Sequence, residues 1–121
     1  MKKTVIIGAS DNPSRYAQIA LQMLKEYDHP VVPMGIHGGE FRGQLILDLR
    51  EKPVVPDVDT ITLYLSPKNQ VEWYDYLLSL EPKRMIFNPG TENRELIDKA
   101  EEKGIEAVIG CTLVMLRTGQ Y

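Results

Sequence analysis

The turn after the first apolar run of the chain carries residues suited to binding an anion. Gly8, Ala9 and Ser10 directly follow the run Thr4-Val5-Ile6-Ile7. Small residues at a turn from strand to helix let a phosphate approach the backbone amides at the positive end of the helix. Gly8 is the only glycine of this turn, so the turn is neither the G-x-G-x-x-G dinucleotide fingerprint nor a P-loop. A tight turn that merely packs also needs small residues, and the pattern leaves both alternatives open.

Three other residues of reactive type stand alone in the sequence: Cys111, His29 and His37. Cys111 is typical of a small buried hydrophobic residue, with a reactive thiol or an acyl carrier as the alternative. We expect His37 to be a solvated surface residue, with a phosphate contact or a role as a base left open. The spacing of these residues does not fit a metal site, and no nucleophile, base and orienting acid can be matched. We therefore predict no metal site and no catalytic residues.

Short apolar runs alternate with amphipathic segments along the whole chain, which is typical of strands alternating with helices. This order predicts one α/β domain over residues 1–121, a three-layer sandwich with a mostly parallel five-stranded sheet. The glycine-rich stretch from Gly35 to Pro56 is expected to be irregular. Strands are predicted at residues 4–7, 31–34, 59–65, 84–87 and 105–109, and helices at 13–27, 67–80 and 92–103.

The predicted helices have recognisable first residues. Asn12 as N-cap with Pro13 in the first turn would begin the first helix, Ser66-Pro67 would begin the second, and Thr91 would cap the third. The second helix is rich in large side chains, Trp73, Tyr74 and Tyr76 among them. A place in the core and a homodimer surface both fit this pattern.

Composition narrows the class of protein and its partners. The 121 residues are 43% hydrophobic and 26% charged, with a net charge of −3, which indicates one ordinary globular domain. A chain without a basic stripe is not expected to bind nucleic acid. No apolar run approaches the ~20 residues that span a bilayer, and residues 1–3 lead straight into a strand rather than a signal-peptide core. With a single cysteine, the expectation is a cytoplasmic protein that does not contact membranes.

In open parallel sheets, ligands bind beyond the carboxyl ends of the strands, where the strand order reverses. The candidate segments are therefore residues 8–16, 35–43, 65–67 and 88–90. The second strand ends in Met34-Gly35-Ile36-His37, without the acidic residue that grips the ribose diol of NAD. This difference counts against NAD and would tolerate a ribose that carries a phosphate, which an acid at this position would repel, although Glu40 follows closely in the sequence.

Several segments make the chain similar to a known family. The run from Val5 to Tyr16, the strand Val31-Val32-Pro33-Met34, the segment 88–93 and the run Val108-Ile109-Gly110-Cys111 resemble the small stand-alone CoA-binding proteins. That family is related to the CoA-binding domain of the succinyl-CoA synthetase alpha subunit. The resemblance implies a Rossmann-like fold that holds coenzyme A between the first turn, the end of the second strand and the Leu65-Ser66-Pro67 turn.

The resemblance also implies roles for individual residues. Gly8, Ala9 and Ser10 would meet the diphosphate, Arg15 would supply positive charge, and the adenosine would lie against the end of the second strand. The family usually reads Val-Asn-Pro where this chain has Met34-Gly35-Ile36, and it usually has a basic residue near Leu65 or Ser66. The full set of predicted cofactor-binding residues is Gly8, Ala9, Ser10, Asn12, Pro13, Arg15, Tyr16, Pro33, Gly35, Ile36, Leu65, Ser66, Pro67, Asn88, Pro89 and Gly90.

Three functions are therefore compared below. The first is binding of coenzyme A or an acyl-CoA without catalysis. The second is an NAD(P)-binding oxidoreductase-like domain, and the third is an interaction protein whose nucleotide site has decayed. The missing glycines of the fingerprint count against NAD(P), and the altered Met34-Gly35-Ile36 keeps the third function open.

Overall fold

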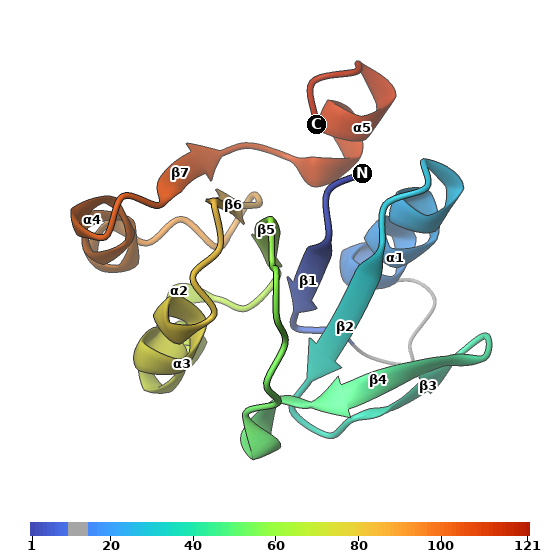
Figure 1. The fold of residues 1–121 in the computed structure, drawn as a ribbon, viewed down its shortest axis with the longest axis horizontal. Coiled ribbons are helices and arrows are strands. Elements are labelled where there is room, and N and C mark those ends of the chain that lie inside the picture. The colour runs from blue at the N-terminus through green and yellow to red at the C-terminus, as the bar shows by residue number, and fades with distance from the viewer. Residues whose placement is uncertain (10–14) are drawn as a thin grey trace.

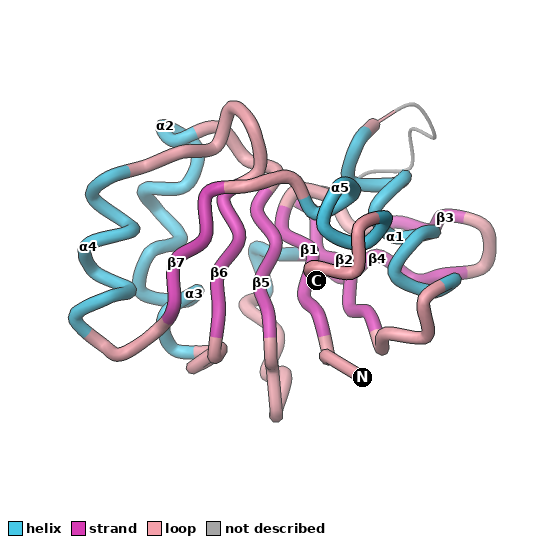
Figure 2. The backbone as a smooth tube through the Cα atoms, turned by 90° about the horizontal axis from the view of Figure 1, so that it is seen from above, coloured by secondary structure: helices cyan, strands magenta, loops and turns pink. Residues whose placement is uncertain are grey.

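The computed structural model describes residues 1–9 and 15–121 of the chain. These residues form a seven-stranded sheet of order β3-β4-β2-β1-β5-β6-β7, whose strands lie side by side in Figure 2. Neighbouring strands are parallel, except that β3 and β4 are antiparallel. The strands are β1 (Thr4–Ile7), β2 (Val31–Gly35), β3 (Gly39–Phe41), β4 (Gln44–Asp48), β5 (Thr60–Leu63), β6 (Arg84–Phe87) and β7 (Glu106–Ile109).

The predicted number of five strands is wrong, because β3 and β4 lie in the stretch expected to be irregular. They form a hairpin whose two turn residues, Arg42 and Gly43, have φ values of 48° and 81°. Positive φ at both positions is the requirement of a type I′ turn, whose twist matches that of the flanking strands. A three-residue strand between glycines has too little alternation of polar and apolar residues to be recognised in the sequence.

Within the described residues there are five α-helices and two 3₁₀ turns, η1 and η2; all lie between strands except α5, which follows the last strand. Helix α1 is described from Tyr16, with Arg15 as its N-cap; the predicted N-cap Asn12 and the predicted first residue Pro13 lie outside the described residues. The predicted cap at Thr91 is wrong: Asn93 caps α4 instead, its Oδ1 accepting a hydrogen bond from the Leu96 amide. The elements are α1 (Tyr16–Glu26), η1 (Leu49–Glu51), α2 (Pro67–Gln70), η2 (Val71–Trp73), α3 (Tyr74–Ser79), α4 (Arg94–Glu102) and α5 (Thr112–Arg117).

The helices form a layer on each face of the sheet, so the predicted three-layer architecture is confirmed. Helices α1 and α5 lie on one side and α3 and α4 on the other (Figure 1). Because side chains alternate along a strand, Ile6 of β1 packs with Leu21 and Leu116 under α1 and α5. Its neighbours Val5 and Ile7 pack in the cluster under α3 and α4. Among the described residues, no helix has both the length and the apolar character needed to cross a membrane.

The large side chains of the second predicted helix belong to the core. Trp73, Tyr74 and Tyr76 are 6%, 8% and 8% exposed and join the cluster under α3 and α4. The core alternative is therefore confirmed for these three residues. A homodimer stays a prediction, but the aromatic side chains that suggested it are buried and do not form an exposed surface.

The position of β1 creates the point at which ligands usually bind in such folds. The chain passes from β1 to β2 and β4 on one side, and later to β5, β6 and β7 on the other. Without β3, this is the 3-2-1-4-5-6 order of a Rossmann sheet, which binds ligands between the carboxyl ends of its two diverging halves. These carboxyl ends lie along the upper edge of the sheet in Figure 2.

Candidate functional site

Two adjoining cavities lie at the carboxyl edge of the sheet, and they share Tyr16, Tyr64 and Pro89. We call them the Gly8 cavity, of about 270 Å³, and the Cys111 cavity, of about 240 Å³. The Gly8 cavity is lined by Gly8, Arg15, Tyr16, Ala17, Tyr64, Ser66, Pro89, Gly90 and Thr91. The Cys111 cavity is lined by Tyr16, Tyr64, Asn88, Pro89, Cys111 and Leu113.

Gly8 lines the first cavity in a backbone conformation suited to glycine. Its φ is +106°, and a Cβ atom there would lie 3.0 Å from the carbonyl carbon of Tyr64. The amides of Gly8 and Ala9 both donate to the Met34 carbonyl oxygen, at 2.9 Å each. Because these two N–H groups already have an acceptor, Gly8 contributes close approach rather than amide donation. Ala9 is only 6% exposed.

The amino end of α1 faces the same cavity. Arg15 is extended, with φ −73° and ψ 141°, and its carbonyl oxygen accepts hydrogen bonds from the amides of Gln18 and Ile19. The side chain of Arg15 is exposed, and Tyr16 and Ala17 follow it in the cavity wall. The first turn of α1 contains no acidic residue. The partial positive charge of the helix end and the charge of the Arg15 side chain would both attract an anion placed in this cavity.

Asn88 holds the ends of three elements in place. Its Nδ2 donates to Thr62 Oγ1 at 2.7 Å and to the Leu63 carbonyl oxygen at 2.9 Å. Its Oδ1 accepts from the Thr112 amide at 2.9 Å, and the hydroxyls of Thr62 and Thr112 are 2.8 Å apart. The side chain is 2% exposed. This one amide thus joins β5, the loop after β6 and the start of α5 at the base of the Cys111 cavity.

Gln70 joins the two loops that form the other walls. Its Nε2 donates to the carbonyl oxygens of Leu65 at 2.8 Å and Thr91 at 2.9 Å, and its Oε1 accepts from Asn93 at 2.9 Å. The side chain is fully buried. Buried networks in which the polar groups have partners fix the backbone around them. The walls carrying Ser66 and Thr91 are therefore held at a set separation before any ligand arrives.

Tyr64 lines both cavities and stays protonated over a wide pH range. Burial raises the pKa of its phenol to about 12, an effect that the nearby Thr62 and Thr112 hydroxyls partly offset. A group with this pKa is neutral near pH 7, so Tyr64 is a wall residue there and not a general base.

The structure brings only some of the predicted site residues together. Those that line the two cavities are Gly8, Arg15, Tyr16, Ser66, Asn88, Pro89 and Gly90. Leu65, Pro67 and Ile36 are half-buried and lie outside the lining, as do Ala9, Pro33 and Gly35, which are buried. Ser10, Asn12 and Pro13 lie outside the described residues. Cofactor contacts of all these residues stay predictions.

Gly35 has a structural reason to be glycine. A Cβ atom at this position would lie 2.0 Å from the Ala9 carbonyl oxygen. The end of β2 and the turn after β1 can therefore approach each other only because residue 35 has no side chain.

Five residues that line the two cavities were not among the predicted cofactor-binding residues: Ala17, Tyr64, Thr91, Cys111 and Leu113. Tyr64 was assigned to the strand, although it follows the last residue of β5 and so stands at the carboxyl edge. Cys111 and Leu113 follow β7, and the position of β7 beside β6 gives the signal that could have found them. That β7 lies beside β6 follows from the order of strands in the sheet and not from any local sequence pattern.

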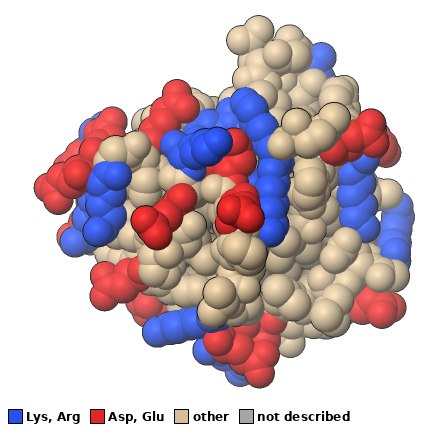
Figure 3. Space-filling model, in the orientation of Figure 1, with Lys and Arg blue, Asp and Glu red and all other residues tan. Residues whose placement is uncertain are grey.

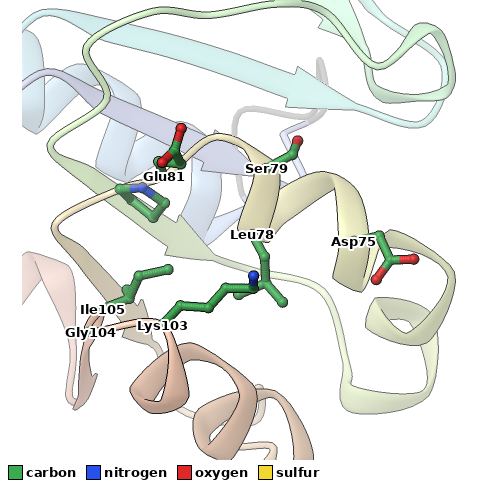
Figure 4. A pocket seen from close by; sticks show the side chains of 8 residues that line it. Asp75, Leu78, Ser79, Glu81, Lys103, Gly104 and Ile105 are labelled. Atoms are coloured by element: carbon green, nitrogen blue, oxygen red, sulfur yellow. The ribbon is translucent and has the colours of Figure 1, made fainter.

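A larger hollow, of about 770 Å³, lies at the opposite, amino-terminal edge of the sheet (Figure 4). Its labelled side chains come from α3 and the turn after it and from the turn after α4, including Asp75, Glu81 and Lys103. The carboxyl ends of both helices border it, and their partial negative charge disfavours an anionic ligand. We therefore place the candidate site at the carboxyl edge despite the smaller volume.

The charges of the molecule are mixed. On the face shown in Figure 3, Lys and Arg side chains are interspersed with Asp and Glu. Within residues 1–9 and 15–121, no three His, Cys, Asp or Glu side chains are grouped so that they could hold a metal ion. The absence of a nucleic-acid partner stays a prediction.

Comparison with solved structures supports the fold over the full length of the chain. A crystal structure described as that of an uncharacterized protein is 53% identical, covers 100% of this chain and 98% of its own, and has a TM-score of 0.96. A hypothetical protein from Pyrococcus horikoshii OT3 is 27% identical, with 98% and 83% of the two chains covered and a TM-score of 0.82.

A more distant structure, from Thermus thermophilus, is 22% identical, covers 99% of this chain and 90% of its own, and has a TM-score of 0.83. Among curated proteins none matches the chain. The family model described as CoA binding domain matches residues 2–117. The resemblance stated from the sequence is thus confirmed, and the chain belongs to the CoA-binding domain family.

Proposed function

We propose that this protein binds coenzyme A or an acyl-CoA at the carboxyl edge of its sheet. The observation that carries the proposal is the Gly8 cavity, where the amino end of α1, the Arg15 guanidinium and a turn without a side chain meet at the reversal of strand order. A diphosphate fits this combination of positive charge and close backbone approach. Membership of the CoA-binding domain family supports the same ligand.

The adenosine would lie toward the end of β2, beside Gly35 and Ile36. The residue that pairs with Gly35 in the register of β2 and β4 is an acid, Asp48. Arg50 holds the Asp48 carboxylate through its Nε at 3.0 Å and its terminal nitrogen at 2.9 Å. Because this carboxylate already has a cation, it is poorly placed to grip the ribose diol of NAD. The half-buried free Cys111 suits a reducing compartment, and we propose the cytoplasm.

Thermal shift measurements with CoA, acetyl-CoA, NAD, NADP and ADP test the proposal. A ligand that binds only the folded state raises the unfolding midpoint. We expect CoA and acetyl-CoA to raise it more than the other three ligands do. The largest shift with NAD or NADP would favour an oxidoreductase-like domain. Absence of a shift with every ligand would favour an interaction protein with a decayed site.

Arg15→Ala tests the location of the diphosphate. Loss of a charge-assisted hydrogen bond should weaken CoA binding by about 1–3 kcal/mol in titration calorimetry, and the melting point of the free protein should barely change. Arg94→Ala is the matched control, because Arg94 is also exposed, at 71%, but lies on α4 beside Asp98. Equal CoA affinities for the Arg15 variant and the wild type would show that the proposed phosphate site is misplaced.

A further inference from the structure

We infer that the Cys111 cavity receives the sulfur end of the ligand together with a short, uncharged acyl group, so that the preferred ligand is a short-chain acyl-CoA. This inference rests on the proposed function, since it concerns the part of the same ligand that lies farthest from the adenosine. It adds the chemical class of the acyl group, which the family does not specify.

The order of strands sets the direction of the ligand. With the adenosine beside β2 and the diphosphate at Gly8, the pantetheine arm must cross the ends of β5 and β6 toward β7. Neighbouring strands are about 4.8 Å apart, so β6 lies roughly 10 Å from β1, a distance that an extended pantetheine arm covers. The two cavities share Tyr16, Tyr64 and Pro89 along this path. The arm therefore leaves the Gly8 cavity directly into the Cys111 cavity.

The chemistry of the lining favours an apolar group. Both N–H groups of the Asn88 amide are used by Thr62 and Leu63, and its oxygen accepts from the Thr112 amide. The Thr62 and Thr112 hydroxyls are bonded to each other. Among the described residues that line the cavity there is no Lys, Arg or His. An acyl group with a terminal carboxylate would be buried there without a cation, which is costly.

The size of the cavity limits the chain length. Its volume of about 240 Å³ is below the ~300–1,000 Å³ of pockets that enclose drug-sized ligands. Leu113, 7% exposed on α5, closes the side toward that helix. A chain of a few carbons fits this space, and a fatty acyl chain does not.

Titration calorimetry with CoA, acetyl-CoA, butyryl-CoA, octanoyl-CoA and succinyl-CoA tests the inference. Burial of each methylene is worth roughly a fourfold gain in affinity, so butyryl-CoA should bind about 15-fold more tightly than acetyl-CoA. Octanoyl-CoA should bind less tightly than butyryl-CoA, and succinyl-CoA at least about tenfold less tightly. Equal affinity for CoA and every thioester would overturn the inference and leave the proposed function intact. Absence of binding by CoA and every thioester would overturn both.

A matched pair of variants on α5 tests the role of the cavity wall. Leu113→Ala enlarges the cavity and should make octanoyl-CoA bind at least as tightly as butyryl-CoA. Val114→Ala is the control, because Val114 is 52% exposed and does not line the cavity; its chain-length preference should equal that of the wild type. An unchanged preference in the folded Leu113 variant would contradict the inference.

A reactive CoA thioester tests the position of the sulfur end in the wild-type protein, independently of any cavity variant. The sulfur of Cys111 would attack the bromine-bearing carbon of bromoacetyl-CoA and displace bromide. The product is a thioether, and the thiol proton is released to solvent. Peptide mass analysis should find the adduct at Cys111, at a rate much above that of bromoacetamide, and excess CoA should suppress it. If bromoacetyl-CoA and bromoacetamide label Cys111 equally fast while CoA binds, the acyl end lies elsewhere.

Discussion

At the scale of single residues, Gly8 combines two demands on one backbone position. Its φ of +106° is rarely adopted by residues with a side chain, and its Cα hydrogen faces the Tyr64 backbone with no room for a further atom. Gly8→Val should therefore destabilise the fold by about 1–3 kcal/mol through backbone strain alone and should abolish CoA binding. Denaturant unfolding and titration calorimetry measure the two effects.

Gly104→Ala is the control for a variant that adds backbone strain but no steric contact. Gly104 has a φ of +77°, but nothing lies within 4 Å of a Cβ atom built there, and the residue is far from the carboxyl edge. Its substitution should cost some stability and leave CoA affinity unchanged. Loss of binding in this variant would mean that destabilisation, rather than the turn, explains the result with Gly8→Val.

The raised pKa of Tyr64 predicts that the folded protein loses stability in alkaline solution. Its folded pKa of about 12 exceeds the ordinary value of 10.0 that applies in the unfolded chain, because burial disfavours the phenolate. The stabilisation is thus fully present below pH 10 and is lost as the pH rises to about 12. The loss for this residue should be about 2–3 kcal/mol.

Denaturant unfolding of the wild type and Tyr64→Phe at pH 9 to 12, roughly the range in which the phenol titrates, measures how much of the loss in free energy of unfolding comes from Tyr64. The variant should lose less free energy of unfolding over the window than the wild type. Burial raises the pKa of Tyr76 to about 12 as well, so the double variant with Tyr76→Phe should lose still less. Identical pH dependence of the wild type and the Tyr64 variant would show that Tyr64 is not the buried phenol responsible.

At the scale of elements, the β3–β4 hairpin depends on two turn residues with positive φ. Arg42 is a poor residue for its φ of 48°, whereas Gly43 suits its φ of 81°. Asparagine before glycine is the favoured pair in type I′ turns. Arg42→Asn should therefore stabilise the hairpin by about 0.5–1 kcal/mol, an effect that hydrogen exchange at the amides of β3 and β4 would detect.

The reverse change provides the comparison. Gly43→Ala imposes the same strain that Arg42→Asn relieves, without a steric contact, since nothing lies within 4 Å of the added atom. It should accelerate exchange in both strands. If neither variant changes exchange there, the hairpin is held by its contact with β2 rather than by its turn.

At the scale of the whole molecule, both helical layers pack on one sheet, so residues 1–121 should unfold as a single domain. Trp73 is the only tryptophan of the sequence and reports on the layer of α3 and α4. Far-UV circular dichroism also reports on α1 and α5. We expect the two signals to give the same denaturant midpoint, as for a two-state domain. Separate midpoints would show that the two faces unfold independently.

The amino-acid sequence by itself determined the features that depend on neighbouring residues. Apolar runs of β-branched residues, such as residues 4–7, predicted the strands because burial on both faces of a parallel sheet requires them. The run from Val5 to Tyr16, together with segments 31–34, 88–93 and 108–111, carried the resemblance to the family, which the family model confirms. The expectation that Gly8 stands at a tight turn was also correct, because a positive φ is a local property of the backbone.

Tertiary structure alone decided what depends on residues far apart in the sequence. The order of strands places Tyr64, Pro89 and Cys111 around adjoining cavities, although 47 positions separate the first from the last. The glycine at position 35 is needed because the Ala9 carbonyl oxygen passes so close to it. No local pattern contains these contacts, since they arise only when parallel strands align their carboxyl ends at one edge of the sheet.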